Sequence, residues 1–336
     1  MLARVGPSVF AVALGLVICG GVITAAGGDP ALALAALFDG AFGSWDAASE
    51  VTVKTCPLLV TGLAVAVAFR AGIWNIGAEG QLLIGAVIMA WLGTRSWPLP
   101  GWCTLPLALM AASAGGALWA GLAAMLKLRR RVSEVISTIM LNFIALALVS
   151  YLVHGPLMEA AGRYPQTDPV TLAMRLPRLV VSFRLHAGIL VALAGAALVY
   201  VLLFRTVLGY QMRAVGWNPD AARLGGIRTD RCALLAFVLS GALAGLAGAI
   251  EISAVTHRLY ERFSPGYGFT AIAVALLGGL HPLGVVGAAI LFGALEAGSN
   301  SMERVAGVSS VLVSIIQATV ILSLVAVEHR KRFRST

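Results

Sequence analysis

Apolar runs of about 20 residues constrain this chain more than any other feature of its sequence. A run of this length crosses the hydrocarbon of a bilayer as a helix, because a helix bonds its backbone polar groups within the segment. Of the 336 residues, 59% are hydrophobic and 12% are charged, whereas soluble domains carry roughly 25% charged residues. The sequence therefore predicts an all-α, polytopic integral membrane protein.

About ten such runs can be recognised by their hydropathy. The expected spans cover residues 8–26, 53–70, 76–94, 104–126, 133–153, 186–204, 232–252, 268–280, 284–300 and 308–327. The spans at 268–280 and 284–300 are short, so we expect half-helices or a re-entrant pair near 268–300. The longest connections are 27–52, 154–185 and 205–231, and none has the length of a soluble domain. Residues 1–336 are therefore expected to form a single transmembrane domain.

Basic residues are concentrated in alternate connections. If the N-terminus is cytoplasmic, the inner segments hold Arg70, the cluster at 127–131, the arginines of 205–231 and the tail after 328. Cytoplasmic loops of membrane proteins carry such an excess of Lys and Arg, which accounts for the net charge of +9 without a nucleic-acid partner. We expect both termini to be cytoplasmic.

Several common active-site motifs are missing from the sequence. It has no GxxxxGK[ST] loop for ATP and no HExxH zinc motif, and its four cysteines are scattered without metal-ligand spacing. We therefore expect no enzymatic activity, no metal site and no cofactor bound by this chain. The cysteines are expected to be small buried apolar residues.

Polar side chains interrupt two of the apolar spans. A charged side chain within a bilayer costs about 2.5–3.5 kcal/mol even on the lenient insertion scale, so such residues are candidate functional groups. One set follows the second span, and the other recurs at helical spacing along the fifth. Both are interpreted either as a substrate pathway or gate, or as contacts that hold helices together. The candidates are Asn75, Glu79, Gln81, Glu134, Thr138 and Asn142, followed by Glu296 and Gln317.

The connection 205–231 contains signals for a short helix outside the hydrocarbon. Asn218 suits an N-cap, Pro219 the first helical position and Asp220 the positive helix N-terminus. Two glycines at 225–226 provide a C-terminal stop. A helix over about 219–224 is therefore expected. We interpret it as a docking element for another protein, and the alternative is an interfacial amphipathic turn.

Together, the segments 69–81, 134–142 and 209–227 resemble the permease subunits of bacterial ABC importers in the branched-chain amino acid and simple-sugar group. The resemblance is nearest to nucleoside-type permeases, and it runs from about residue 50 to 327. Asp220-Ala221-Ala222 followed by Gly226 is similar to the EAA–x3–Gly loop of ABC permeases, with Asp in place of Glu.

The resemblance implies an ATP-driven importer in the bacterial inner membrane. Its partners would be a cytoplasmic ABC ATPase that holds ATP and Mg²⁺, a second permease subunit that is a paralogue, an extracytoplasmic substrate-binding protein and the surrounding lipid. The implied solute is a nucleoside, or alternatively a simple sugar or amino acid. An ion-coupled secondary transporter, with Glu79 on the coupling ion, remains an alternative. The implied ATPase-coupling residues are Arg213, Gly216, Asn218, Pro219, Asp220, Ala221, Ala222, Arg223 and Gly226.

Overall fold

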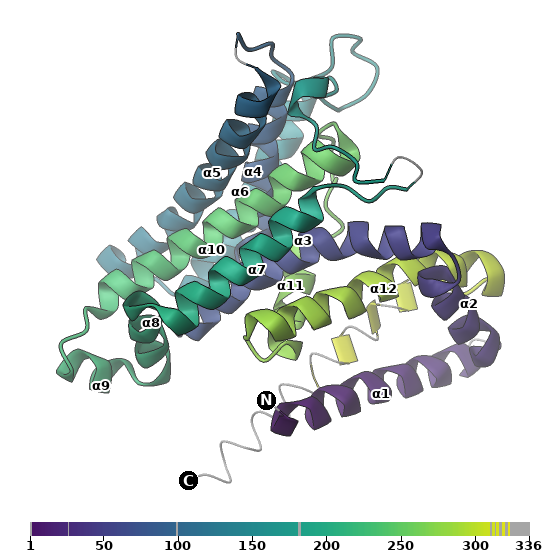
Figure 1. The fold of residues 1–336 in the computed structure, drawn as a ribbon, viewed down its shortest axis with the longest axis horizontal. Coiled ribbons are helices and arrows are strands. Elements are labelled where there is room, and N and C mark those ends of the chain that lie inside the picture. Colours follow the sequence, from purple (N-terminus) through teal and green to yellow (C-terminus); the bar gives the residue numbers. More distant parts are fainter. Residues whose placement is uncertain are drawn as a thin grey trace.

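The computed structural model describes residues 2–25, 27–98, 100–180 and 183–309, with scattered positions from 311 to 322. Helices account for nearly all regular structure in these residues (Figure 1). The α-helices are α1 (Leu2–Ala25), α2 (Pro30–Phe42), α3 (Trp45–Arg70), α4 (Ala78–Gly93), α5 (Gly101–Arg130), α6 (Glu134–His154), α7 (Gly188–Arg205), α8 (Val207–Trp217), α9 (Pro219–Leu224), α10 (Thr229–Glu251), α11 (Tyr267–Leu277) and α12 (Pro282–Ala306). A 3₁₀ turn covers Leu172–Met174, and a π-helical turn, η2, covers Ile252–Thr256.

Among the described residues, six helices are long and apolar enough to cross a membrane, namely α3, α5, α6, α7, α10 and α12. Shorter apolar helices lie in α1, α2, α4 and α11. The predicted all-α, polytopic membrane architecture is confirmed. A helix of 11 residues, α11, also confirms the short segment expected at 268–280.

Two span predictions differ from the structure. Helix α2 occupies part of the connection 27–52, and its 13 residues are too few for a search that looks for spans of about 20 residues. Helix α12 is 25 residues long rather than a short segment at 284–300, because polar and charged residues of its C-terminal part lower the hydropathy without ending the helix. The span expected at 308–327 lies largely outside the described residues, and Gln317 lies outside them.

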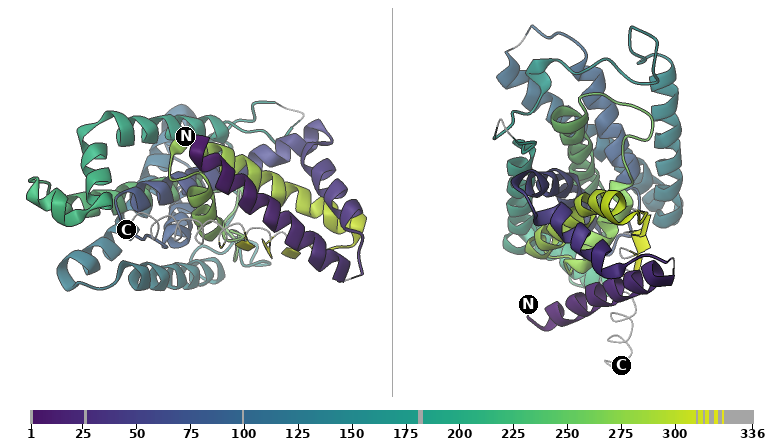
Figure 2. Two further views of the ribbon diagram at one scale, coloured as in Figure 1. Left: turned by 90° about the horizontal axis from the view of Figure 1, so that it is seen from below. Right: turned by 90° about the vertical axis from the view of Figure 1, so that its right-hand side faces the viewer.

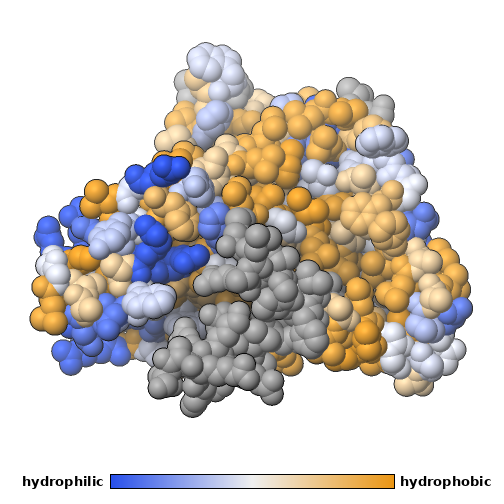
Figure 3. Space-filling model, turned by 60° about the horizontal axis from the view of Figure 1, so that its bottom comes forward, coloured by the Kyte–Doolittle hydropathy of each residue, from blue (hydrophilic) through white to orange (hydrophobic). Residues whose placement is uncertain are grey.

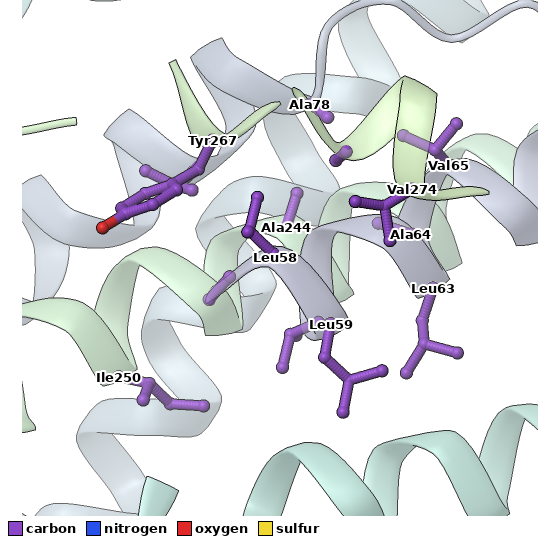
Figure 4. Packing of buried hydrophobic residues seen from close by; sticks show 14 of the residues in the cluster. Leu58, Leu59, Leu63, Ala64, Val65, Ala78, Ala244, Ile250, Tyr267 and Val274 are labelled. Carbon is purple, nitrogen blue, oxygen red and sulfur yellow. The ribbon is translucent and has the colours of Figure 1, made fainter. Parts of the chain in front are cut away.

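Helix α3 runs through the centre of the molecule. It packs against α10 on one side and against α12 and α11 on the other (Figure 1 and Figure 2). In the most apolar stretch of 18 residues in α3, 89% is buried inside the chain. Figure 4 shows Leu58, Leu59 and Leu63 of α3 within this apolar core, near Val274 of α11. Burial on every side explains why α3 has no single polar face.

Glycines let α10 lie against α4 and α5 with their backbones in contact. A Cβ on Gly245 would meet the carbonyl oxygen of Ala112 at 2.6 Å, and one on Gly85 would overlap Gly245. Small residues allow this close approach in membrane helices, where van der Waals packing drives association. The small residues around Gly241–Gly245 are therefore helix contacts, as their spacing predicts.

Candidate functional site

The backbone between α3 and α4 leaves the helical path and enters the bundle. Gly72 has a φ of +74°, which favours glycine, and Asn75 reaches Ser240, halfway along α10. The Asn75 Nδ2 donates to Ser240 Oγ at 2.9 Å and to Gln81 Oε1 at 3.2 Å, while Gln81 Nε2 donates to Asn75 Oδ1 at 3.1 Å. Both amides are buried. The two predicted residues thus pair with each other and fix this segment to α10.

Helix α6 holds the same segment from its other side. Asn142 Oδ1 accepts a hydrogen bond from the Gly80 backbone N–H at 2.8 Å, and its Nδ2 donates to the Ile76 carbonyl at 2.9 Å. Thr138 Oγ1 accepts from the Ile76 N–H at 3.3 Å. Asn142 therefore satisfies backbone groups that the start of α4 leaves unpaired.

Glu79 lies where the N-termini of α4 and α11 meet. Its side chain is in the first turn of α4, is 3% exposed, and accepts a hydrogen bond from the Gly268 N–H at 2.6 Å. Helix N-termini attract negative charge, so one carboxylate stabilises two short helices here. A Cβ on Gly268 would overlap the Glu79 backbone, which explains the glycine in α11.

These five residues, Asn75, Glu79, Gln81, Thr138 and Asn142, form a buried set that we call the polar junction. Their hydrogen bonds run to one another, to the Ser240 side chain of α10, and to backbone groups of α4, α6, α11 and the segment before α4. Glu134, the sixth candidate, lies at the start of α6, where its backbone carbonyl accepts a hydrogen bond from Thr138 Oγ1 at 2.6 Å and its Oε1 pairs with Lys127 Nζ at 2.7 Å. The geometry favours a structural joint, and a role in the substrate pathway stays a prediction.

Helix α9 covers Pro219–Leu224, the residues for which the capping signals predict a helix. Asn218 Oδ1 accepts hydrogen bonds from the N–H groups of Asp220 and Ala221, both at 3.0 Å. Ala222 is buried against Val215 and Cys232, which fixes α9 to α8 and α10. Figure 3 shows hydrophilic side chains gathered at the end of the molecule that carries α8 and α9.

Large apolar side chains remain exposed at this hydrophilic end, above all those of Trp217 and Leu224. Trp217, next to the N-cap, is 93% exposed, and Leu224, the last residue of α9, is 91% exposed. Exposed aromatic and aliphatic residues within a polar rim are typical of protein interfaces.

The other predicted coupling residues do not form one cluster with α9. Arg223 lies 3.7 Å from Asp220 on the exposed surface, and Gly226 has a φ of +81° in the turn after α9. Arg213 turns away from α9, with its guanidinium 5.0 Å from the centre of the Phe204 ring. The coupling role of the whole set stays a prediction.

Gly216 provides a contact between α8 and the end of α3. A Cβ on Gly216 would overlap the Arg70 carbonyl oxygen and lie 2.9 Å from the Gly72 nitrogen. The Arg70 side chain in turn donates to the carbonyl oxygens of Leu280 and Gly279, at 2.9 and 3.2 Å. Sequence reasoning placed Gly216 in the coupling set but did not identify Gly72 as its contact, because the two residues are distant in the chain.

The loop between α6 and α7 is held in place by a charged side chain. Glu159 accepts hydrogen bonds from Gln166 Nε2 at 2.7 Å, from Arg258 Nη1 at 2.8 Å and from the Tyr164 N–H. The hydrogen bond from Gln166, followed by those from Tyr164 and Arg258, holds the pKa of this carboxyl below its usual range. The connection 154–185 is thus tied to the segment after α10.

Comparison with known proteins identifies the family. The family model for the permease component of branched-chain amino acid transport systems matches residues 47–325. The glucose ABC transporter permease protein TsgB13 of Haloferax volcanii is 39% identical, covering 98% of this chain and 89% of that protein. The guanosine ABC transporter permease protein NupP of Bacillus subtilis is 38% identical, covering 96% of this chain and 93% of that protein.

A third relative, the nucleoside ABC transporter permease protein NupB of Lactococcus lactis, is 30% identical, and the match covers 93% of this chain and 88% of that protein. No solved structure matches the chain. The family match, the near-complete coverage of these relatives and the apolar helices agree with one another. This chain belongs to the family of permease components of branched-chain amino acid transport systems and is a permease subunit of an ABC transporter.

Proposed function

We propose that this permease imports a solute that carries a sugar, and that a nucleoside is its substrate. The observation that carries the proposal is the similarity, at 38% and 30% identity over nearly the whole chain, to permeases named for guanosine and nucleosides. Glucose is the second candidate, because the relative named for glucose is 39% identical. Glucose and nucleosides share a sugar ring with neighbouring hydroxyl groups, so one site could recognise that feature in both.

The proposed complex places ATP hydrolysis on other chains. A cytoplasmic ABC ATPase, which holds ATP and Mg²⁺, would bind α9 through Trp217 and Leu224, and an extracytoplasmic binding protein would deliver the solute at the opposite face. A second permease subunit, a paralogue of this one, would complete the cavity. The hydrophilic end at α8 and α9 supports a cytoplasmic position for these two helices (Figure 3). The proposal keeps both chain termini on the cytoplasmic side of the bacterial inner membrane, as the distribution of basic residues predicts.

An ion-coupled transporter is less compatible with the geometry. Such a mechanism would use Glu79 to hold a coupling ion, whereas that carboxylate already accepts the Gly268 N–H. The test is uptake of labelled guanosine into vesicles that contain the permease pair, the ATPase and the binding protein. We expect uptake to require ATP and the ATPase. Uptake by the permease alone along an ion gradient would contradict the proposal.

Replacing Asn218-Pro219-Asp220 with three glycines should uncouple uptake from ATP hydrolysis. Glycine in place of the Asn218 N-cap costs about a few tenths of a kcal/mol, and each of the two glycines within the helix costs up to about 1 kcal/mol. A helix of 6 residues has few other interactions to offset these losses. We expect ATP hydrolysis to continue while guanosine uptake is lost, as measured in the same vesicles.

The matched control is Asn218→Ser, which keeps an N-cap and should retain uptake. Normal uptake by the triple-glycine variant would show that α9 is not a coupling element.

A further inference from the structure

A second group of polar side chains lies on the opposite side of the polar junction from α9. It consists of Lys54 on α3, Glu251 on α10, Glu296 on α12 and Tyr267 on α11, and we call it the outer polar cluster. Lys54 Nζ is 3.6 Å from Glu296 Oε1, and both of these residues are close enough to act electrostatically on Glu251. Since α10 starts just after α9 and ends at Glu251, the outer polar cluster lies toward the face where solute would enter.

Two members of the outer polar cluster have mostly buried side chains that make no hydrogen bond. Glu251 is 5% exposed and Tyr267 is 3% exposed. Within the part of the chain that the structure describes, no donor bonds to the Glu251 carboxylate and no group bonds to the Tyr267 hydroxyl. Figure 4 shows the Tyr267 ring extending away from Leu58 and Leu63 of the apolar core. Neither the Glu251 carboxylate nor the Tyr267 hydroxyl is among the fully enclosed, unpaired polar atoms of the described residues, so both border accessible space in which a ligand could bond to them.

The backbone next to Glu251 is also unusual. Immediately after this residue, α10 changes into the π-helical turn η2 at Ile252–Thr256. Turns of this kind are rare and occur frequently at functional sites. The polar junction provides the contrast, because its Glu79 carboxylate already bonds to the Gly268 N–H. Of the two polar sets, the outer polar cluster is the one with unused hydrogen-bonding capacity.

The groups of the outer polar cluster match the hydroxyls of a sugar. A hydroxyl donates one hydrogen bond and accepts others, so neighbouring hydroxyls require acceptors and donors side by side. Glu251 supplies a carboxylate acceptor, whereas Lys54 and Tyr267 supply donors. We propose that the outer polar cluster binds the neighbouring hydroxyls of the sugar ring during transport. This proposal rests on the proposed function and names the part of the chain that contacts the solute.

The test compares guanosine with 2′-deoxyguanosine in the complete transporter with ATP. Both solutes pass through the same binding protein, so its contribution cancels when variants of this chain are compared. For Glu251→Gln we expect the KM for guanosine uptake to rise about tenfold or more, because the hydrogen bond that a sugar hydroxyl donates to the carboxylate is replaced by a weaker one to a neutral amide. The KM for 2′-deoxyguanosine should change less, so that discrimination between the two solutes falls. Tyr267→Phe, which removes only the hydroxyl, should act in the same direction.

Glu303→Gln is the matched control, because Glu303 is an exposed carboxylate on the same helix as Glu296. It should leave both KM values unchanged. Unchanged guanosine KM and unchanged discrimination in Glu251→Gln and Tyr267→Phe would overturn the assignment. If Glu251→Gln does not assemble, Tyr267→Phe decides the outcome. Absence of ATP-driven uptake of guanosine and glucose by the wild-type complex would instead refute the proposed function.

Discussion

Gly216→Val is expected to lower ATP-driven uptake by about ten- to a hundredfold. The new side chain would overlap the Arg70 carbonyl at a site where two backbones are in contact. Overpacking costs about 1–3 kcal/mol, and about 1.4 kcal/mol corresponds to a factor of ten. Relief of the overlap requires α8 to move away from the end of α3, which displaces α9 relative to the polar junction. The measurement is guanosine uptake together with ATP hydrolysis in vesicles.

Gly195→Val is the matched control for this substitution. Gly195 is also a helical glycine, on α7, and a Cβ there meets nothing within 4 Å. Its uptake should stay close to that of the wild type. Full uptake by Gly216→Val would mean that the contact between α8 and α3 is not used in coupling.

Asn142→Ala is expected to lower both the thermal stability of the subunit and its transport rate. The substitution leaves the buried Gly80 N–H and Ile76 carbonyl without their partner, at about 1–3 kcal/mol for each unsatisfied group. The start of α4 and the segment before it would lose their attachment to α6. Thermal unfolding of the purified subunit in detergent measures the first effect, and guanosine uptake measures the second.

The two measurements together separate a joint from a pathway residue. If Asn142 has a structural role, its replacement should lower the thermal stability of the subunit with or without solute. If Asn142 contacts the solute, its replacement should raise the KM for guanosine uptake and leave the stability unchanged. Ser150→Ala, near the outer end of α6, removes a single exposed hydrogen bond to Glu261 and serves as the control. If Asn142→Ala left both stability and uptake unchanged, neither role would be supported.

Local signals predicted the local structure well. The bounds of α9 follow from Asn218, Pro219 and the glycines after Leu224, because caps act within one turn of the helix. The long spans follow from the bilayer thickness. Helix α2 was missed because hydropathy reports the length of an apolar run, and a short helix can be held by packing alone, here against α12.

The partners of the polar residues could not be predicted, because they lie far away in sequence. Asn75 and Glu79 are visible as polar residues near apolar spans, but their contacts with Ser240 and Gly268 depend on how α10 and α11 pack. Glu251 was missed although it has the same signal, a carboxylate at the end of an apolar run. Only the structure distinguishes the bonded carboxylate of Glu79 from the unbonded one of Glu251.

The contact between Gly216 and the end of α3 also has a mechanical consequence. Flexible side chains can absorb a small displacement by changing rotamer, whereas two touching backbones cannot. Gly216 lies two residues before Asn218, so this contact is close to the place where an ATPase bound at α9 would act under the proposed function. A displacement of α9 would therefore be transmitted to the segment at 71–77 with little loss. The size of the resulting movement would depend on the distance between α9 and the contact at Gly216.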